Sequence, residues 1–246
     1  MVDAAPATSG LTAAKTLLSV RNLESWYGES HVLHGVDFDV QQGEVVTLLG
    51  RNGAGKTTTL KSVMGIIGKR SGAITFEGKD ILRATSDSVA RLGVAFCPEE
   101  RGIFASLSVE ENLMLPPQVR AGGLSLTQIF ELFPNLKERL KSQGTKLSGG
   151  EQQMLAIARI LRTGARFLML DEPTEGLAPV IIQQIGRTIA RLKAEGFTIL
   201  LVEQNFRFAS TLADRFYVME HGKIIDTFAN SELQAKMDKL HAYLGV

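Results

Sequence analysis

The stretch GRNGAGKTT, residues 50–58, combines closely spaced glycines with one lysine and two threonines. It matches the pattern G-x-x-x-x-G-K-[ST] and lies between an apolar run and a helical segment. This context argues against the alternative, a glycine-rich turn that matches the pattern by chance. Gly53 and Gly55 let the backbone curl, so several N–H groups converge on one anion at a helix N-terminus. Lys56 then reaches the β- and γ-phosphates of ATP, and the Thr57 hydroxyl binds Mg²⁺. The predicted phosphate contacts are Asn52, Gly53, Ala54, Gly55, Lys56, Thr57 and Thr58.

Two carboxylates follow a second apolar run, FLML, at residues 167–170. At the tip of a strand beside the phosphate loop, Asp171 is placed to hold Mg²⁺ through water. Glu172 is placed to polarise the attacking water as a general base. The alternative is that one of the two only caps a turn at Pro173. We therefore predict a site that hydrolyses its nucleotide.

The segments of sequence that flank these residues, and must position them, indicate an α/β fold. Residues 44–50, 167–170 and 198–202 are continuous apolar runs, typical of parallel strands covered on both faces. The amphipathic segment 180–196 connects two of them and ends at a glycine, so strand, helix and strand form a right-handed parallel unit.

Other parts of the chain differ in pattern from this core. The segment before residue 44 alternates apolar and polar residues, as half-buried strands do. Residues 99–163 have helical spacing, with Ser108 and Ser125 as N-caps. Two short strands turn at His221-Gly222, and a helix ends the chain. We expect an α/β core that is interrupted by a mostly helical insertion.

The composition limits the class of protein. In 246 residues, 27 Lys and Arg nearly balance 26 Asp and Glu, which argues against a polyanion binder that depends on broad charge. Cys97 is the only cysteine, so no disulfide forms within the chain; this fits a reducing compartment and a small core residue. The N-terminal stretch has no apolar centre typical of a signal peptide, and no run of 18 apolar residues occurs, so we expect no membrane span.

A third motif, KLSGGEQQ at residues 146–153, opens a helix whose N-terminus is suited to phosphate. With GRNGAGKTT before it and LMLDEP after it, the chain resembles the ATP-binding subunits of ABC transporters over about residues 16–230. The resemblance implies an α/β, RecA-like P-loop NTPase core with an antiparallel β subdomain and a helical insertion. It divides the chain into a disordered tail, residues 1–15, and one cassette, residues 16–246. Within the cassette, the core comprises residues 16–98 and 162–246, and the helical subdomain comprises about residues 99–161.

The same resemblance implies how the nucleotide sites are completed. Two cassettes pair head to tail around two ATP, and Ser148, Gly149 and Gly150 of one contact the γ-phosphate held by the other. Tyr27 matches the aromatic residue that stacks on adenine; the alternative is an ordinary strand aromatic. Glu151 departs from the pattern, because glutamine usually follows the two glycines.

Three further positions depart from the common pattern of the family. Glu99 replaces glutamine in the loop that joins the core to the helical region; it could bind Mg²⁺ or the attacking water, or be a surface carboxylate. Glu175-Gly176-Leu177-Ala178 replaces Ser-Ala-Leu-Asp. Gln204 replaces the switch histidine, so it could donate an amide hydrogen to the γ-phosphate but has no proton to exchange. Beside it, Glu203 and Asn205 are expected to act locally, Asn205 as an N-cap.

The stretches of sequence that contain these departures resemble one group within the family. CPEERGIFASLSVEENL, DEPTEGLAPVI and LVEQN are similar to the smaller ATP-binding subunit of branched-chain amino-acid importers, and to related urea and amide importers. The resemblance implies a second ATP-binding subunit (a copy of this chain or a homologue), two transmembrane permease subunits, and indirectly a substrate-binding protein. It also implies a place at the cytoplasmic face of the membrane, with residues 99–115 contacting the permeases.

Two other functions remain as alternatives. Gln204 and Ala178 would suit a cassette that binds ATP without useful hydrolysis, whereas Lys56, Asp171 and Glu172 argue against it. A soluble ABC ATPase of translation or DNA repair usually has two cassettes or a long coiled-coil insertion. This chain has neither, and its near-zero charge predicts no nucleic-acid partner. No residue here determines the transported solute, because that choice belongs to the other subunits.

Overall fold

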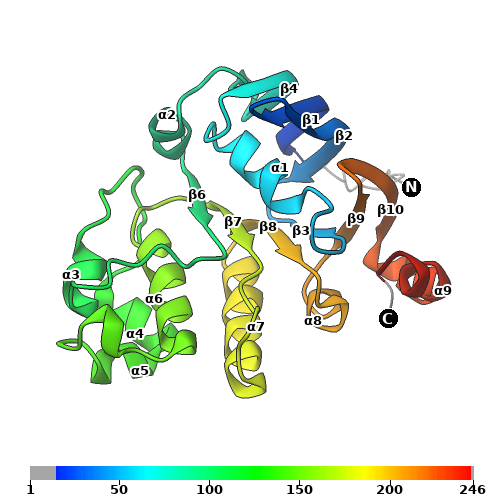
Figure 1. Cartoon of the computed structure of the whole chain (residues 1–246). Helices are drawn as coiled ribbons and strands as arrows, with labels where there is room; N and C mark the ends of the chain where they lie inside the picture. The colour runs from blue at the N-terminus through cyan, green and yellow to red at the C-terminus, as the bar shows by residue number, and fades with distance from the viewer. Residues whose placement is uncertain (1–14, 245–246) are drawn as a thin grey trace, which may run out of the picture.

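The computed structural model describes residues 15–244, which form a six-stranded sheet, a four-stranded sheet and the helices around them (Figure 1). The predicted tail, residues 1–15, lies outside the described residues except for Lys15. An α/β core, an antiparallel sheet and a helical insertion are all present, which confirms the predicted fold class.

The six-stranded sheet is the centre of the core. In spatial order its strands are β10 (Lys223–Ala229), β9 (Arg215–Glu220), β3 (Val45–Leu49), β8 (Thr198–Glu203), β7 (Phe167–Asp171) and β6 (Val94–Cys97). Every residue of β3, β7 and β8 is buried, which explains their unbroken apolar runs. Because these strands are parallel, with Leu49 beside Glu203 and Asp171 beside Val202, the segments that follow them leave the sheet at one edge.

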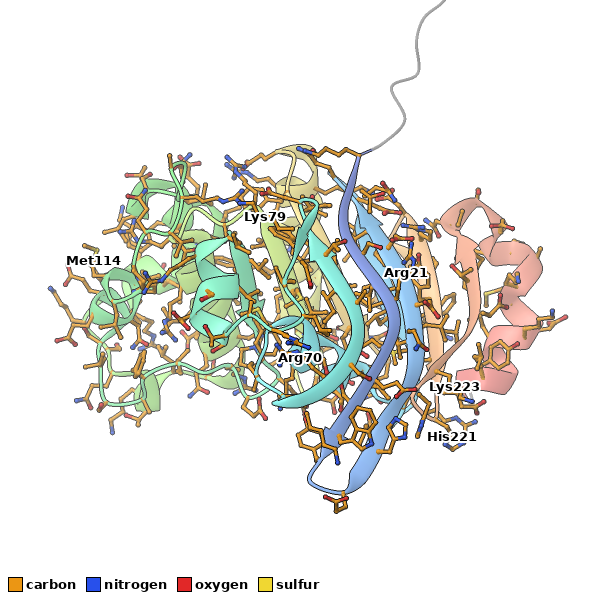
Figure 2. The ribbon with its side chains drawn as sticks, turned by 90° about the horizontal axis from the view of Figure 1, so that it is seen from above. Arg21, Arg70, Lys79, Met114, His221 and Lys223 are labelled. Carbon is orange, nitrogen blue, oxygen red and sulfur yellow. The ribbon has the colours of Figure 1, made fainter. Side chains whose placement is uncertain are left out.

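The four-stranded antiparallel sheet covers one side of the core. Its strands are β2 (Ser30–Gln41), β1 (Thr16–Tyr27), β4 (Lys69–Phe76) and β5 (Lys79–Asp80), in spatial order. Phe76 of β4 packs on Phe167 of β7, with ring centroids 5.6 Å apart. Figure 2 looks down on this sheet, with Arg21, Arg70 and Lys79 on its strands. Helix α1 (Lys56–Val63) joins the same apolar core through Leu60 and Val63.

The helical insertion lies between β6 and β7 in the chain and on the β6 side of the sheet (Figure 1). Ser108 and Ser125 cap their helices through complete capping boxes, so both predicted caps are confirmed. The helices of the insertion are α3 (Val109–Met114), α4 (Leu126–Leu132), α5 (Pro134–Glu138), the 3₁₀ turn η1 (Gly144–Lys146) and α6 (Gly149–Leu161).

The remaining helices lie outside the insertion. They are α2 (Ser86–Arg91), α7 (Pro179–Ala194), α8 (Phe206–Ser210), η2 (Asn230–Glu232) and α9 (Leu233–Leu244). The predicted turn at His221-Gly222 is confirmed, since both residues have positive φ between the antiparallel strands β9 and β10. Within residues 15–244, no helix is both long and apolar enough to cross a bilayer.

Candidate active site

The loop between β3 and α1 wraps around the side chain of its own lysine. Lys56 is buried, and its Nζ donates hydrogen bonds to the carbonyl oxygens of Gly50 at 2.7 Å and Arg51 at 3.1 Å. Gly55 caps α1 with φ 105°, and a Cβ there would lie 2.9 Å from Leu33 Cδ2, so only glycine fits. The loop therefore presents backbone N–H groups and one ammonium at the start of a helix, which is an anion-binding arrangement.

The Glu172 carboxylate lies against this lysine. Its Oε1 is 3.1 Å from Lys56 Nζ, and both side chains are almost completely buried. Glu172 has φ 43°, in the left-handed region, and its N–H donates to Val202 O at 2.9 Å. A strained backbone that is held by the neighbouring strand is common at functional positions. An anion that enters the loop must compete with Glu172 for the lysine.

Asp171 meets the threonine of the same loop. Thr57 Oγ1 donates a 3.0 Å hydrogen bond to Asp171 Oδ1, while Oδ2 is buried and has no partner among the described residues. Burial raises the pKa of Asp171 to about 6, although the Thr57 hydrogen bond opposes this. A hydroxyl and a carboxylate with one unpaired oxygen suit a hard divalent cation such as Mg²⁺. No group of three or more His, Cys, Asp or Glu suited to a metal occurs within residues 15–244.

A cleft of about 310 Å³ opens over the loop and gathers most of the predicted phosphate contacts. Ala54 is buried beneath the loop and does not line it. Glu99 lines the cleft, which is where its predicted role requires it. Glu175, to which sequence reasoning assigned no role, lines it too. The full lining is Val32, Asn52, Gly53, Gly55, Lys56, Thr57, Thr58, Glu99, Glu172 and Glu175.

Gln204 lies beside this cleft, not in it. It lines a neighbouring cavity of about 480 Å³ together with Gly50, Asn52 and Glu175. Gln204 Nε2 donates a 2.8 Å hydrogen bond to Glu175 Oε2. Asn205 caps α8, since its Oδ1 accepts from Phe208 N at 3.1 Å, which confirms the predicted local role of Asn205.

Glu203 is the buried member of the polar cluster after β8. It is 1% exposed and accepts a 2.8 Å hydrogen bond from Thr174 Oγ1. Burial raises the pKa of Glu203 to about 7, and Glu172 nearby adds to the rise. Its role is local, as expected, because it ties the segment after β7 to the end of β8.

The Ser148-Gly149-Gly150 motif begins α6 in the helical insertion. Ser148 and Glu151 form a capping box, in which Ser148 N donates to Glu151 Oε2 at 2.8 Å. Glu151 therefore has a local role at the start of α6, one that a glutamine also performs, as Gln128 does with Ser125. None of the three motif residues lines the cleft over the chain's own loop, because α6 lies in the helical insertion, away from β3 and α1 (Figure 1).

Two other candidates differ in their surroundings. Tyr27, at the end of β1, is 50% exposed and does not line the phosphate cleft. Cys97 is buried, and burial raises the pKa of its thiol to about 12, so it is unreactive at neutral pH. The predicted core position of Cys97 is confirmed.

A phosphate loop after β3, a carboxylate pair after β7 and a helical insertion before β7 define an ATP-binding cassette with a P-loop NTPase core. The chain belongs to the ABC transporter family, whose profile matches residues 33–175. It therefore belongs to a family of ATPases, as the sequence predicted.

Individual relatives agree with this assignment. The chain is 42% identical over 238 residues to BraG of Pseudomonas aeruginosa, a high-affinity branched-chain amino acid transport ATP-binding protein; the match covers 93% of this chain and 100% of BraG. It is 35% identical over 234 residues to the lipopolysaccharide export system ATP-binding protein LptB of Escherichia coli, covering 93% and 97%. A nucleotide-free ATP-binding cassette from an ABC transporter superposes with a TM-score of 0.81 at 25% identity, covering 94% and 99%.

Proposed function

We propose that this chain is the ATP-hydrolysing subunit of an importer for branched-chain amino acids or related small polar amides. The contact between Lys56 and Glu172 supports hydrolysis, because it places a carboxylate and a phosphate-binding cation at one point of the cleft. The similarity to BraG, a branched-chain amino acid transport protein, supports transport of this class of solute. The similarity to LptB makes an exporter the second candidate, at lower identity.

Each residue of the cleft has a separate role in the proposed hydrolysis of ATP. The loop amides and Lys56 bind the β- and γ-phosphates, and these phosphates displace Glu172 from the lysine. Glu172, released, accepts the proton of the attacking water as general base. Thr57 and Asp171 would hold Mg²⁺, which supplies positive charge against the phosphate oxygens. Glu99 assists as an oxygen ligand of the ion or of the water.

Turnover requires a second cassette. Ser148, Gly149 and Gly150 lie in the helical insertion, and in a head-to-tail pair they reach the γ-phosphate on the partner's loop. Tyr27 stacks on the adenine. ATP binding closes the pair and hydrolysis reopens it, since the two arrangements differ in affinity for the nucleotide. The partner is a homologous cassette or a second copy of this chain.

The surface of the insertion supplies a docking place for the permease subunits. Phe104, Met114 and Leu115 are 46%, 58% and 51% exposed. They follow directly from the loop that contains Glu99, so movement at the phosphate cleft reaches this surface along the chain. Figure 2 shows Met114 at the outer edge of the insertion. Through these contacts the chain works at the cytoplasmic face of the membrane, with no nucleic acid involved.

Uptake in cells that lack this chain tests the proposal. We expect leucine or amide uptake to fall when the chain is removed, to return with the wild type, and to stay low with Glu172→Gln. Normal uptake of these solutes together with defective lipid export would instead favour the exporter. Phosphate release from Mg-ATP, measured with the chain alone and mixed with a homologous cassette, tests hydrolysis directly.

A further inference from the structure

Glu175 and Gln204 occupy two of the positions at which the sequence departs from the common pattern of the family, and the fold brings them into contact. Gln204 Nε2 donates to Glu175 Oε2 at 2.8 Å. The residues are 29 positions apart, one in the segment after β7 and the other after β8. Two departures that look separate in the sequence therefore form one interaction, which we call the 175–204 clasp.

Buried contacts next to the clasp hold the two segments in register. Glu172 N donates to Val202 O at 2.9 Å. Thr174 Oγ1 donates to Glu203 Oε1 at 2.8 Å, and both residues are buried. These bonds continue the β7–β8 pairing beyond the ends of the strands. These bonds hold the segments that carry the clasp, while the Glu175 side chain itself is exposed and that of Gln204 is half-buried.

The carboxylate decides which end of the Gln204 amide faces it. A carboxamide has an oxygen that only accepts and a nitrogen with two hydrogens that only donates. An ionised carboxylate only accepts, so the nitrogen must turn toward Glu175. One amide hydrogen is used in this bond, and the second has no hydrogen-bond partner within the described part of the chain.

The location of Glu175 relates the orientation of the Gln204 amide to the phosphate cleft. Glu175 lines both the phosphate cleft and the neighbouring cavity that contains Gln204. A nitrogen that is hydrogen-bonded to Glu175 therefore lies against a residue that the cleft and the neighbouring cavity share. An amide oxygen in its place would repel a phosphate, whereas the second N–H is able to donate to one.

We propose that Glu175 is a positioning residue that holds the Gln204 carboxamide with its nitrogen toward the phosphate cleft. Glu175 does not act on the nucleotide itself; it acts through Gln204. The idea rests on the proposed function, because it presumes that Gln204 contacts the γ-phosphate during turnover.

The first test examines the clasp without any nucleotide. In the ¹⁵N-labelled full chain, the signal of the Gln204 side-chain NH₂ is assigned by its loss in Gln204→Met. We expect Glu175→Ala to shift that signal and to bring its two proton frequencies closer together. Glu195→Ala is the matched control. It also removes an exposed carboxylate, which pairs with Arg191 at the far end of α7 and does not contact Gln204. An unchanged signal in Glu175→Ala would overturn the clasp.

The second test measures ATP hydrolysis by the full chain with its partner cassette. Glu175→Ala should lower kcat/KM about 10-fold, the size of one charge-assisted hydrogen bond. Glu175→Gln keeps an acceptor oxygen but loses the charge and gains an NH₂ group, so its kcat/KM should fall between those of wild type and Glu175→Ala. In the Gln204→Met background, Glu175→Ala should have no additional effect, because the residue that it positions is already absent.

The outcomes separate the clasp from the proposed function. If Glu175→Gln is as defective as Glu175→Ala, or if the Glu175 and Gln204 effects multiply, Glu175 acts by its charge or on another group, and the positioning role is wrong. A wild-type assembly that hydrolyses no Mg-ATP contradicts the proposed function instead, while the NMR result still decides whether the clasp forms.

Discussion

Lys56 Nζ lies 3.1 Å from Glu172 Oε1, and the two side chains are 4% and 8% exposed. In the proposed mechanism these are the group that binds phosphate and the group that activates water, and here the two buried side chains are paired with each other. Breaking such a pair on one side leaves a buried charge, so its exchange for a phosphate must be nearly balanced. On the proposed mechanism, we expect the arriving phosphate to release Glu172 from Lys56.

Glu172→Gln should separate binding from hydrolysis. We expect ATP turnover to fall by about 100-fold or more, because a glutamine cannot accept the proton of water. ATP affinity should stay the same or rise, since the carboxylate that competes for Lys56 is gone. Phosphate release and fluorescent-nucleotide titration measure the two quantities. With Glu195→Gln as the remote control, near wild-type turnover in Glu172→Gln would show that another group is the base.

Ser148→Arg should block pairing of cassettes and leave nucleotide binding by each chain intact. In a Glu172→Gln background, ATP should produce dimers on size-exclusion chromatography, and Ser148→Arg should abolish them. The monomer should still bind ATP, because Ser148 does not line the cleft over its own loop.

Ser125→Arg is the control for Ser148→Arg. Ser125 caps α4 through the same kind of capping box, so both variants lose about 1 kcal/mol of helix stabilisation. Only the Ser148 variant should fail to dimerise. A Ser148 variant that loses its own ATP affinity would contradict the head-to-tail arrangement.

Met114→Glu should weaken attachment to the permease subunits. Met114 is 58% exposed on the insertion, and a charge there disfavours an apolar contact. We expect less co-purification with the permeases and unchanged ATP affinity. Ile225→Glu is matched to it, because Ile225 is 38% exposed on β10, at the opposite end of the molecule (Figure 1). Equal losses in both variants would argue against a docking surface at the insertion.

Glu203→Gln should make stability less dependent on pH. Burial raises the pKa of Glu203 to about 7 from an ordinary value of 4.5, so the folded chain holds this proton more tightly than the unfolded chain. The stabilising effect of the protonated acid is complete below pH 4.5 and is lost as the pH rises through about 7. At pH 8 the glutamine variant, which carries no charge, should be more stable than wild type by on the order of 2–3 kcal/mol.

Urea unfolding at pH 5 and pH 8 checks the Glu203 prediction. The wild type should lose more stability than Glu203→Gln between the two pH values. Thr174→Val, which removes the hydroxyl that bonds Glu203 and keeps the shape, should raise the pKa of Glu203 further and steepen the loss. Identical pH profiles for wild type and Glu203→Gln would show that Glu203 titrates normally.

Some parts of the fold gave weak signals in the sequence. The apolar strands β3, β7 and β8 are predictable, since burial on both faces leaves an unbroken run. Strand β4 is not, because most of its residues from Lys69 to Ala73 are exposed and only Ile74 and Phe76 are buried in the core. Its place is decided by pairing with β1, a contact between distant parts of the chain.

The chemistry that is local along the chain is predictable from the sequence. A glycine-rich loop, its lysine and threonine, and a carboxylate pair after an apolar strand are contiguous motifs whose geometry follows from short-range sterics and strand burial. Tertiary structure decided which of these groups touch: Glu172 on Lys56, Asp171 on Thr57, and Gln204 on Glu175. The register of parallel strands, joined by long connections, sets such contacts, and no local pattern encodes that register.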